Sequence, residues 1–111
     1  MSLPRQLLVV AGTRPEIIKQ APLRFAAAGR ADWRVRFCFS GQHREMGAQA
    51  FDDLGFAPDD TLDLMQPGQT PDAFLGAAVP ALASLIRRER PAWVAVQGDT
   101  TTALAGALAA F

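Results

Sequence analysis

Short, continuous apolar runs alternate along the chain with longer segments that have helical spacing. The runs predict strands at residues 7–11, 33–39, 62–65 and 92–97. The longer segments predict a helix after Thr13, a helix at residues 44–54, a helix capped by Thr70 and a helix at residues 100–111. The apolar stripe of the helix after Thr70 is expected at Phe74, Ala78, Leu82 and Leu85. Strands that alternate with helices favour an α/β fold with a doubly wound, Rossmann-like parallel sheet. The right-handed crossover rule then favours the strand order three-two-one-four, with the first and fourth strands adjacent.

The first helix carries several boundary signals. Thr13 followed three residues later by Glu16 predicts a capping box, Pro22 predicts a bend, and Gly29 predicts the end of the helix. One apolar stripe is expected to face the sheet: Ile17, Ala21, Phe25 and Ala28. Met46 and Met65 are most simply core residues, and the fourth helix is rich in alanine.

Composition narrows the class of protein. Half of the 111 residues are apolar and a fifth are charged, which is typical of one soluble globular domain. The formal net charge of zero gives no reason to expect nucleic acid or a membrane as a partner. Cys38 is the only cysteine and is expected in the core, so no intrachain disulfide can form and a reducing cytoplasm fits. Residues 1–5 do not lead into a signal peptide, and the run at 7–11 is too short to cross a membrane.

Polar loops follow three of the predicted strands. They span residues 12–16, 40–45 and 97–102. Because ligands of open parallel sheets bind beyond the carboxyl ends of the strands, all three loops are expected on one side. The crevice should lie between the first and fourth strands, flanked by Arg14 and Asp99.

The turn from Gly12 to Glu16 is suited to an anion. Gly12 permits a tight turn, the start of the helix offers free N–H groups, and Arg14 adds a forked donor for phosphate. The alternative is that Arg14 is simply a solvated residue of the first turn. The turn does not match the dinucleotide pattern Gly-x-Gly-x-x-Gly, which disfavours NAD and FAD.

The remaining polar residues leave alternatives open. Either Asp99 or Thr100 could cap the last helix, and only a capping Thr100 leaves Asp99 free to face the crevice. His43 is the only histidine and has too few neighbouring ligands for a metal site. With Gln42 it could donate to phosphate or sugar hydroxyls, or both could be ordinary loop residues. A solvated side chain is the default for Lys19.

Four blocks of sequence closely resemble the bacterial non-hydrolysing UDP-N-acetylglucosamine 2-epimerases. They are Gly-Thr-Arg-Pro-Glu-Ile-Ile-Lys at 12–19, Gly-Gln-His-Arg-Glu-Met at 41–46, Pro-Gly-Gln-Thr at 67–70 and Gln-Gly-Asp-Thr-Thr-Thr at 97–102. The resemblance implies a two-domain, glycosyltransferase-B-like enzyme that interconverts UDP-N-acetylglucosamine and UDP-N-acetylmannosamine. It also implies elimination and re-addition of UDP, without nicotinamide, metal or other cofactor.

The resemblance also implies a role for each matching residue. The residues that it implies are catalytic are Asp99, Arg14 and Lys19. The residues that it implies bind the substrate are Gly12, Thr13, Arg14 and Lys19. Gln42, His43 and Gln69 would belong to a neighbouring site where UDP-N-acetylglucosamine acts as an activator.

The chain ends abruptly in an apolar helix, which predicts that it is the amino-terminal part of a longer protein, with residues 1–111 forming a truncated Rossmann-like domain. The resemblance implies two further catalytic glutamates, a histidine and a whole carboxyl-terminal domain beyond Phe111. We therefore expect the 111-residue chain to be inactive alone, and the intact protein to be a homodimer.

The alternatives to the non-hydrolysing epimerase are a hydrolysing UDP-N-acetylglucosamine 2-epimerase, a glycosyltransferase-B enzyme and a non-catalytic nucleotide-binding module.

Overall fold

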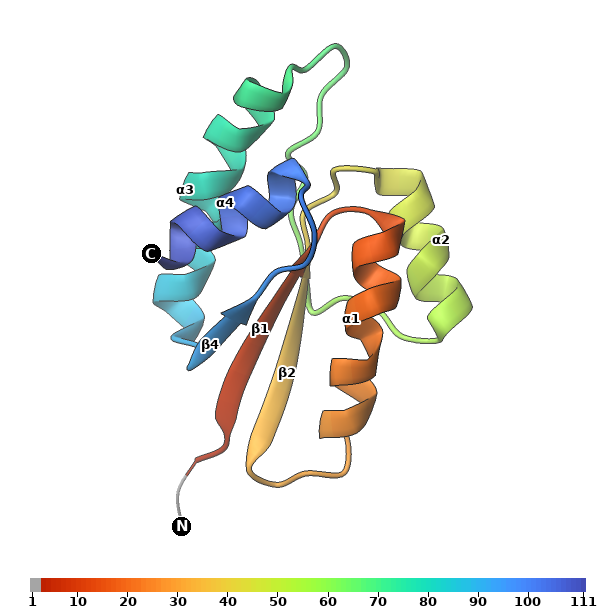
Figure 1. Cartoon of the computed structure of the whole chain (residues 1–111), viewed down its shortest axis with the longest axis vertical. Coiled ribbons are helices and arrows are strands. Elements are labelled where there is room, and N and C mark those ends of the chain that lie inside the picture. The colour runs from red at the N-terminus through yellow and green to blue at the C-terminus, as the bar shows by residue number, and fades with distance from the viewer. Residues whose placement is uncertain (1–2) are drawn as a thin grey trace.

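Four parallel strands form the sheet at the centre of the computed structural model, which describes residues 3–111 (Figure 1). They are β1 (Arg5–Ala11), β2 (Trp33–Phe39), β3 (Asp60–Thr61) and β4 (Trp93–Ala95). Their order is β3-β2-β1-β4, with every neighbouring pair parallel. The predicted fold class and strand order are confirmed. Met1 and Ser2 lie outside the described residues. They belong to residues 1–5, which we expected not to lead into a signal peptide.

Four helices cover the sheet on both faces (Figure 1). They are α1 (Arg14–Ala27), α2 (Arg44–Leu54), α3 (Pro71–Glu89) and α4 (Thr101–Ala110). Leu8 and Val10 of β1 pack with α3 and α4, whereas Val9 and Ala11 pack with α1 and α2. Because successive residues of β1 face opposite layers and both layers are helical, the strand is a continuous apolar run.

The predicted caps are present at two helix starts. Thr13 is the N-cap of α1 in a capping box with Glu16, and Thr70 Oγ1 accepts the Ala73 N–H at the start of α3. The α3 stripe is also buried as predicted, through Phe74, Ala78, Leu82 and Leu85. Helix α1 passes through Pro22 and ends at Ala27, two residues before the predicted Gly29.

Several predictions about the core and the third strand are wrong. Strand β3 is Asp60–Thr61, because only these residues pair with β2; the apolar residues of 62–65 pack against the α3 layer instead or lie exposed. Phe25 is 52% exposed, because its ring makes a T-shaped contact with Phe56 in the partly exposed segment after α2, and Ala28 is also exposed. The side chains of both predicted core methionines are exposed as well: Met46 and Met65.

The β4 edge of the sheet is apolar and open in the part of the chain that the structure describes. Trp93 is 66% exposed, and Leu104 and Leu108 of the adjacent α4 are half exposed. An unpaired parallel strand with apolar neighbours is a surface that another polypeptide segment can cover. Across residues 3–111, none of the helices combines the length and the apolar composition needed to span a membrane.

Cys38 lies fully buried in β2, as predicted, among residues of the α3 and α4 layer. Burial raises the pKa of its thiol to about 12, and the nearby Asp60 carboxylate adds to the rise. We expect the folded chain to resist thiol-labelling reagents at pH 8, because the thiol stays protonated and inaccessible. Labelling should become fast in denaturant, and equally fast labelling of the folded chain would contradict this assignment.

Candidate functional site

The loops after β1, β2 and β4 meet at the carboxyl edge of the sheet. Ala11 pairs with Phe39 in the parallel register, so the chain leaves β1 and β2 at the same level. The Ser40 N–H donates to Ala11 O at 2.9 Å, and the His43 N–H donates to Gly12 O at 3.0 Å. These backbone contacts place the predicted polar loops together, as expected from the parallel topology.

A buried polar network joins the loop after β2 to the start of α4. The hydroxyls of Ser40 and Thr102 lie 2.8 Å apart, and both residues are fully buried. The Gln42 side-chain oxygen accepts from the Thr102 hydroxyl at 2.6 Å and from the Thr102 N–H at 3.2 Å. Every buried hydroxyl of this network therefore has a partner, which favours one fixed arrangement of the loops.

Gly12 lies directly beneath this network. A Cβ atom added to Gly12 would fall 2.2 Å from Thr102 Oγ1 and 2.5 Å from Ser40 Oγ. The backbone φ angle of Gly12 is not positive, so its conformation is one that other residues can also adopt. The requirement for glycine here comes from close packing rather than from the tight turn that the sequence suggested.

The Glu16 carboxylate accepts hydrogen bonds from the turn that precedes α1. Its Oε1 accepts from Gly12 N at 3.2 Å, from Thr13 N at 3.0 Å and from Thr13 Oγ1 at 2.9 Å. These two N–H groups are therefore satisfied within the chain, while the expectation of an anion at the start of α1 stays a prediction. Capping by Glu16 satisfies the donors that a phosphate would otherwise use.

Thr100, not Asp99, caps α4. The Thr100 Oγ1 atom accepts the Ala103 N–H at 3.1 Å. Asp99 is exposed, and its carboxylate makes no hydrogen bond or ion pair with the residues that the structure describes. The alternative that the sequence left open is thus decided: Asp99 remains available to a ligand at the edge of β4.

Arg14 points to α2 rather than across to Asp99. Both of its terminal nitrogens lie 3.4 Å from Asp53 Oδ2, and both side chains are substantially exposed. The expectation that Arg14 flanks the crevice opposite Asp99 does not hold for this conformation. Exposed pairs of this kind contribute about 0–1 kcal/mol, so a phosphate can compete with Asp53 for the guanidinium.

Lys19 is exposed on α1 and pairs with no carboxylate among residues 3–111.

The three residues of the predicted activator site lie in different settings. Gln42 belongs to the buried network with Thr102, which brings it closer to α4 than its position after β2 suggested. The His43 side chain is exposed at the start of α2. Gln69 closes its own turn, because its side-chain oxygen accepts the Gln66 N–H at 3.2 Å.

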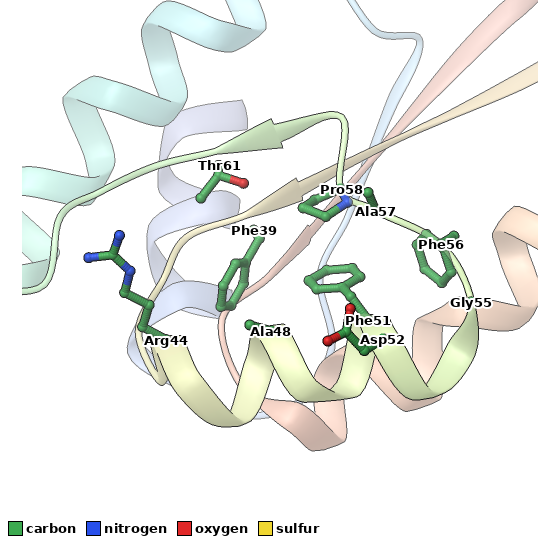
Figure 2. A pocket seen from close by; sticks show the side chains of 10 residues that line it. All are labelled: Phe39, Arg44, Ala48, Phe51, Asp52, Gly55, Phe56, Ala57, Pro58 and Thr61. Atoms are coloured by element: carbon green, nitrogen blue, oxygen red, sulfur yellow. The ribbon is translucent and has the colours of Figure 1, made fainter.

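A hollow lies away from these residues (Figure 2). It has a volume of about 510 Å³ and lies between α2, the segment after Gly55, and β3. Its walls are largely aromatic, through Phe39, Phe51 and Phe56, and it contains none of the predicted site residues. This hollow is therefore separate from the candidate site.

The sequence analysis did not predict that Ser40 and Thr102 are buried partners in the network. It also did not predict that Glu16 accepts a hydrogen bond from Gly12 in addition to capping α1. The signal that could have found them is Ser40 directly after one apolar strand, together with the run of three threonines at 100–102 where the last helix begins. Buried hydroxyl groups need partners, and parallel strands bring their carboxyl ends together.

An open parallel sheet with polar loops at its carboxyl edge defines a Rossmann-like domain of the kind that binds nucleotides. A family model described as UDP-N-acetylglucosamine 2-epimerase matches residues 26–111. The chain belongs to this family. Its fold matches that of UDP-N-acetylglucosamine 2-epimerases, which have glycosyltransferase-B architecture.

Individual relatives agree with this assignment. The UDP-N-acetylglucosamine 2-epimerase of Escherichia coli K12 is 42% identical over 106 residues, which are 96% of this chain and 28% of that protein. The crystal structure of the Neisseria meningitidis enzyme bound to UDP-GlcNAc is 35% identical, with a TM-score of 0.88 over 96% of this chain and 29% of that one. The Methanocaldococcus jannaschii enzyme in complex with UDP-GlcNAc and UDP is 34% identical, with a TM-score of 0.82 over 95% of this chain and 29% of that one. This chain spans less than a third of the length of these relatives.

Proposed function

We propose that this chain supplies the amino-terminal part of the active site in an enzyme that interconverts UDP-N-acetylglucosamine and UDP-N-acetylmannosamine. Residues 1–111 form the start of the first domain, and a second domain closes over the carboxyl edge of the sheet. The observation that carries the proposal is the meeting of three polar loops at that edge in a member of the epimerase family. The relatives whose structures hold UDP-GlcNAc support the choice of ligand.

In the proposed reaction the Asp99 carboxylate removes the proton from C2 of the sugar. The bond between C1 and the diphosphate oxygen breaks, UDP leaves, and a 2-acetamidoglucal forms. The diphosphate oxygen of UDP then bonds again to C1 while C2 takes up a proton on the opposite face of the sugar ring, which inverts the configuration at C2. Arg14 and Lys19 serve the diphosphate, where charge develops as UDP departs. Asp99 is exposed in this chain, so the groups that exclude water from the base come from the second domain.

Gly12 and Thr13 contribute to substrate binding by fixing the turn that carries Arg14. Because Glu16 already occupies their N–H groups, side chains provide the main phosphate contacts. Gln42, His43 and Gln69 form part of a second site for UDP-N-acetylglucosamine as an activator. The Gln42 amide nitrogen and the exposed His43 ring are the groups available to such a ligand.

We also propose a cytoplasmic enzyme of polysaccharide biosynthesis that is a homodimer when intact. A single buried, reduced cysteine suits the cytoplasm. The apolar β4 edge provides surface for further chain segments and for association. Light scattering on the intact protein would measure the mass, and a monomer would contradict the dimer.

Replacing Arg14 by alanine is expected to weaken binding of UDP to this chain. A charge-assisted contact contributes about 1.5–3 kcal/mol, which corresponds to roughly a 10-fold to 150-fold change in Kd. Titration of UDP into the ¹⁵N-labelled chain, followed by NMR, measures both the affinity and the residues that respond.

Arg30→Ala is the matched control, because Arg30 forms a comparably exposed ion pair with Asp32 beyond the far end of α1. The control should leave the affinity for UDP unchanged. Equal affinity of the Arg14→Ala variant and the wild type would rule out the phosphate role of Arg14. Absence of any UDP binding by the wild-type chain would remove support for the proposed nucleotide site.

A further inference from the structure

Glu16 is the most fully buried carboxylate at the candidate site, with an exposed fraction of 1%. Its Oε1 atom accepts three hydrogen bonds from the Gly12–Thr13 turn. Its Oε2 atom accepts a fourth, from the Thr100 hydroxyl at 3.0 Å. Burying a carboxylate is costly unless such donors surround it, so four donors at one carboxylate favour a single geometry.

The bond to Thr100 goes beyond what helix capping requires. A capping box needs only the contact between Glu16 and the N-cap backbone three residues earlier. The contact with Thr100 instead joins two loops that are 84 residues apart in the sequence. Thr100 caps α4 and directly follows Asp99, whereas Arg14 lies two residues before Glu16.

We infer that Glu16 is a positioning residue, which holds the loop of the proposed base Asp99 against the turn that carries Arg14. This inference rests on the proposed function. One oxygen of the carboxylate fixes the turn after β1, and the other fixes the loop after β4. The two loops therefore keep one spacing before substrate arrives, which reduces the ordering that binding would otherwise require.

The same carboxylate also limits where the diphosphate can lie. Glu16 uses the N–H groups of Gly12 and Thr13, and its negative charge repels a phosphate from the inside of the turn. The diphosphate is therefore held outside the turn, by the Arg14 side chain. In this structure the Arg14 side chain lies toward Asp53 of α2, so the guanidinium has to leave that exposed ion pair to hold the diphosphate.

The test uses the ¹⁵N-labelled 111-residue chain and UDP as the probe. Glu16→Gln keeps an oxygen acceptor for the turn but removes the charge and one acceptor oxygen, and Glu16→Ala removes all four bonds. Glu45→Ala is the matched control, because Glu45 is an exposed glutamate in the first turn of α2. Thr100→Ser keeps the hydroxyl and should behave as the wild type.

We expect both Glu16 variants to lower the heteronuclear NOE of residues 98–100, while Glu45→Ala and Thr100→Ser leave it unchanged. The loop lies far from Glu16 in sequence, so a purely local capping role would not move this readout. The affinity for UDP should fall about tenfold in Glu16→Gln, since binding then has to order the loop. Thermal unfolding confirms that each variant is folded at the temperature of measurement.

An unchanged loop NOE in folded Glu16→Gln and Glu16→Ala variants would overturn the inference. So would a lowered NOE in the Glu45→Ala control, because the effect would then not be specific to Glu16. If the wild-type chain binds no UDP, the proposed function loses its support, but the NOE comparison still decides whether Glu16 holds the two loops together. The two failures are therefore distinguishable.

Discussion

Asp99→Asn is expected to lower the rate of UDP-sugar interconversion by about 10²–10⁴-fold, the contribution usual for a general base. Asparagine has nearly the same shape as aspartate but cannot accept the C2 proton. Asp99 is exposed and does not cap α4, so the change should leave the fold and the nucleotide contacts intact. The loss should therefore appear in kcat, with little change in KM.

A chimeric enzyme provides the measurement. Residues 1–111 would replace the matching segment of the Escherichia coli relative, with which this chain shares 42% identity. The unsubstituted chimera must first interconvert the two UDP-sugars, as judged by chromatography of the products. Asp63→Asn is a suitable control, since Asp63 is an exposed aspartate paired only with Arg44. Equal turnover by the Asp99→Asn chimera and its parent would remove Asp99 from the mechanism.

Gly12→Ala is expected to destabilise the 111-residue chain by roughly 2–6 kcal/mol. The added methyl group would lie 2.2 Å from Thr102 Oγ1 and 2.9 Å from Thr102 Cβ, so the loops must move apart. Overpacking of this kind costs about 1–3 kcal/mol. Breaking the buried hydrogen bond between Ser40 and Thr102 adds about 1–3 kcal/mol.

Urea unfolding of the 111-residue chain measures this free energy. Gly76→Ala is the control, because a Cβ atom at Gly76 meets nothing within 4 Å and the residue lies inside α3. That change should be neutral or stabilising by about 0.5–1 kcal/mol, since alanine favours helix. A Gly12→Ala variant within about 0.5 kcal/mol of the wild type would mean that the loops are not closely packed.

The strand order and the two helical layers could be predicted because they depend on local pattern and on general rules. The run from Leu7 to Ala11 is buried on both faces, and its neighbours follow the handedness of parallel crossovers. The same reasoning placed the polar loops at one edge. It failed for Phe25, because helical spacing identifies a stripe but not the residue that each member contacts, and Phe25 lies half exposed against Phe56.

The ion pair of Arg14 shows a second limit of sequence reasoning. Its partner Asp53 lies 39 residues away, on a helix whose distance from α1 depends on how both helices pack on the sheet. The role of Gly12 shows the same limit. Glycine at this position suggested backbone freedom, whereas the structure attributes it to the approach of Thr102 from α4.

By itself, the sequence determined the α/β class, the strand order, the caps at Thr13 and Thr70, and the loops that form the candidate site. These features follow from spacing, side-chain chemistry and chain handedness, which act over short distances. Only the tertiary structure decided which buried polar groups meet. The bonds of Glu16 to Thr100 and of Gln42 to Thr102 join residues 84 and 60 positions apart, and they exist because parallel strands end together at one edge of the sheet.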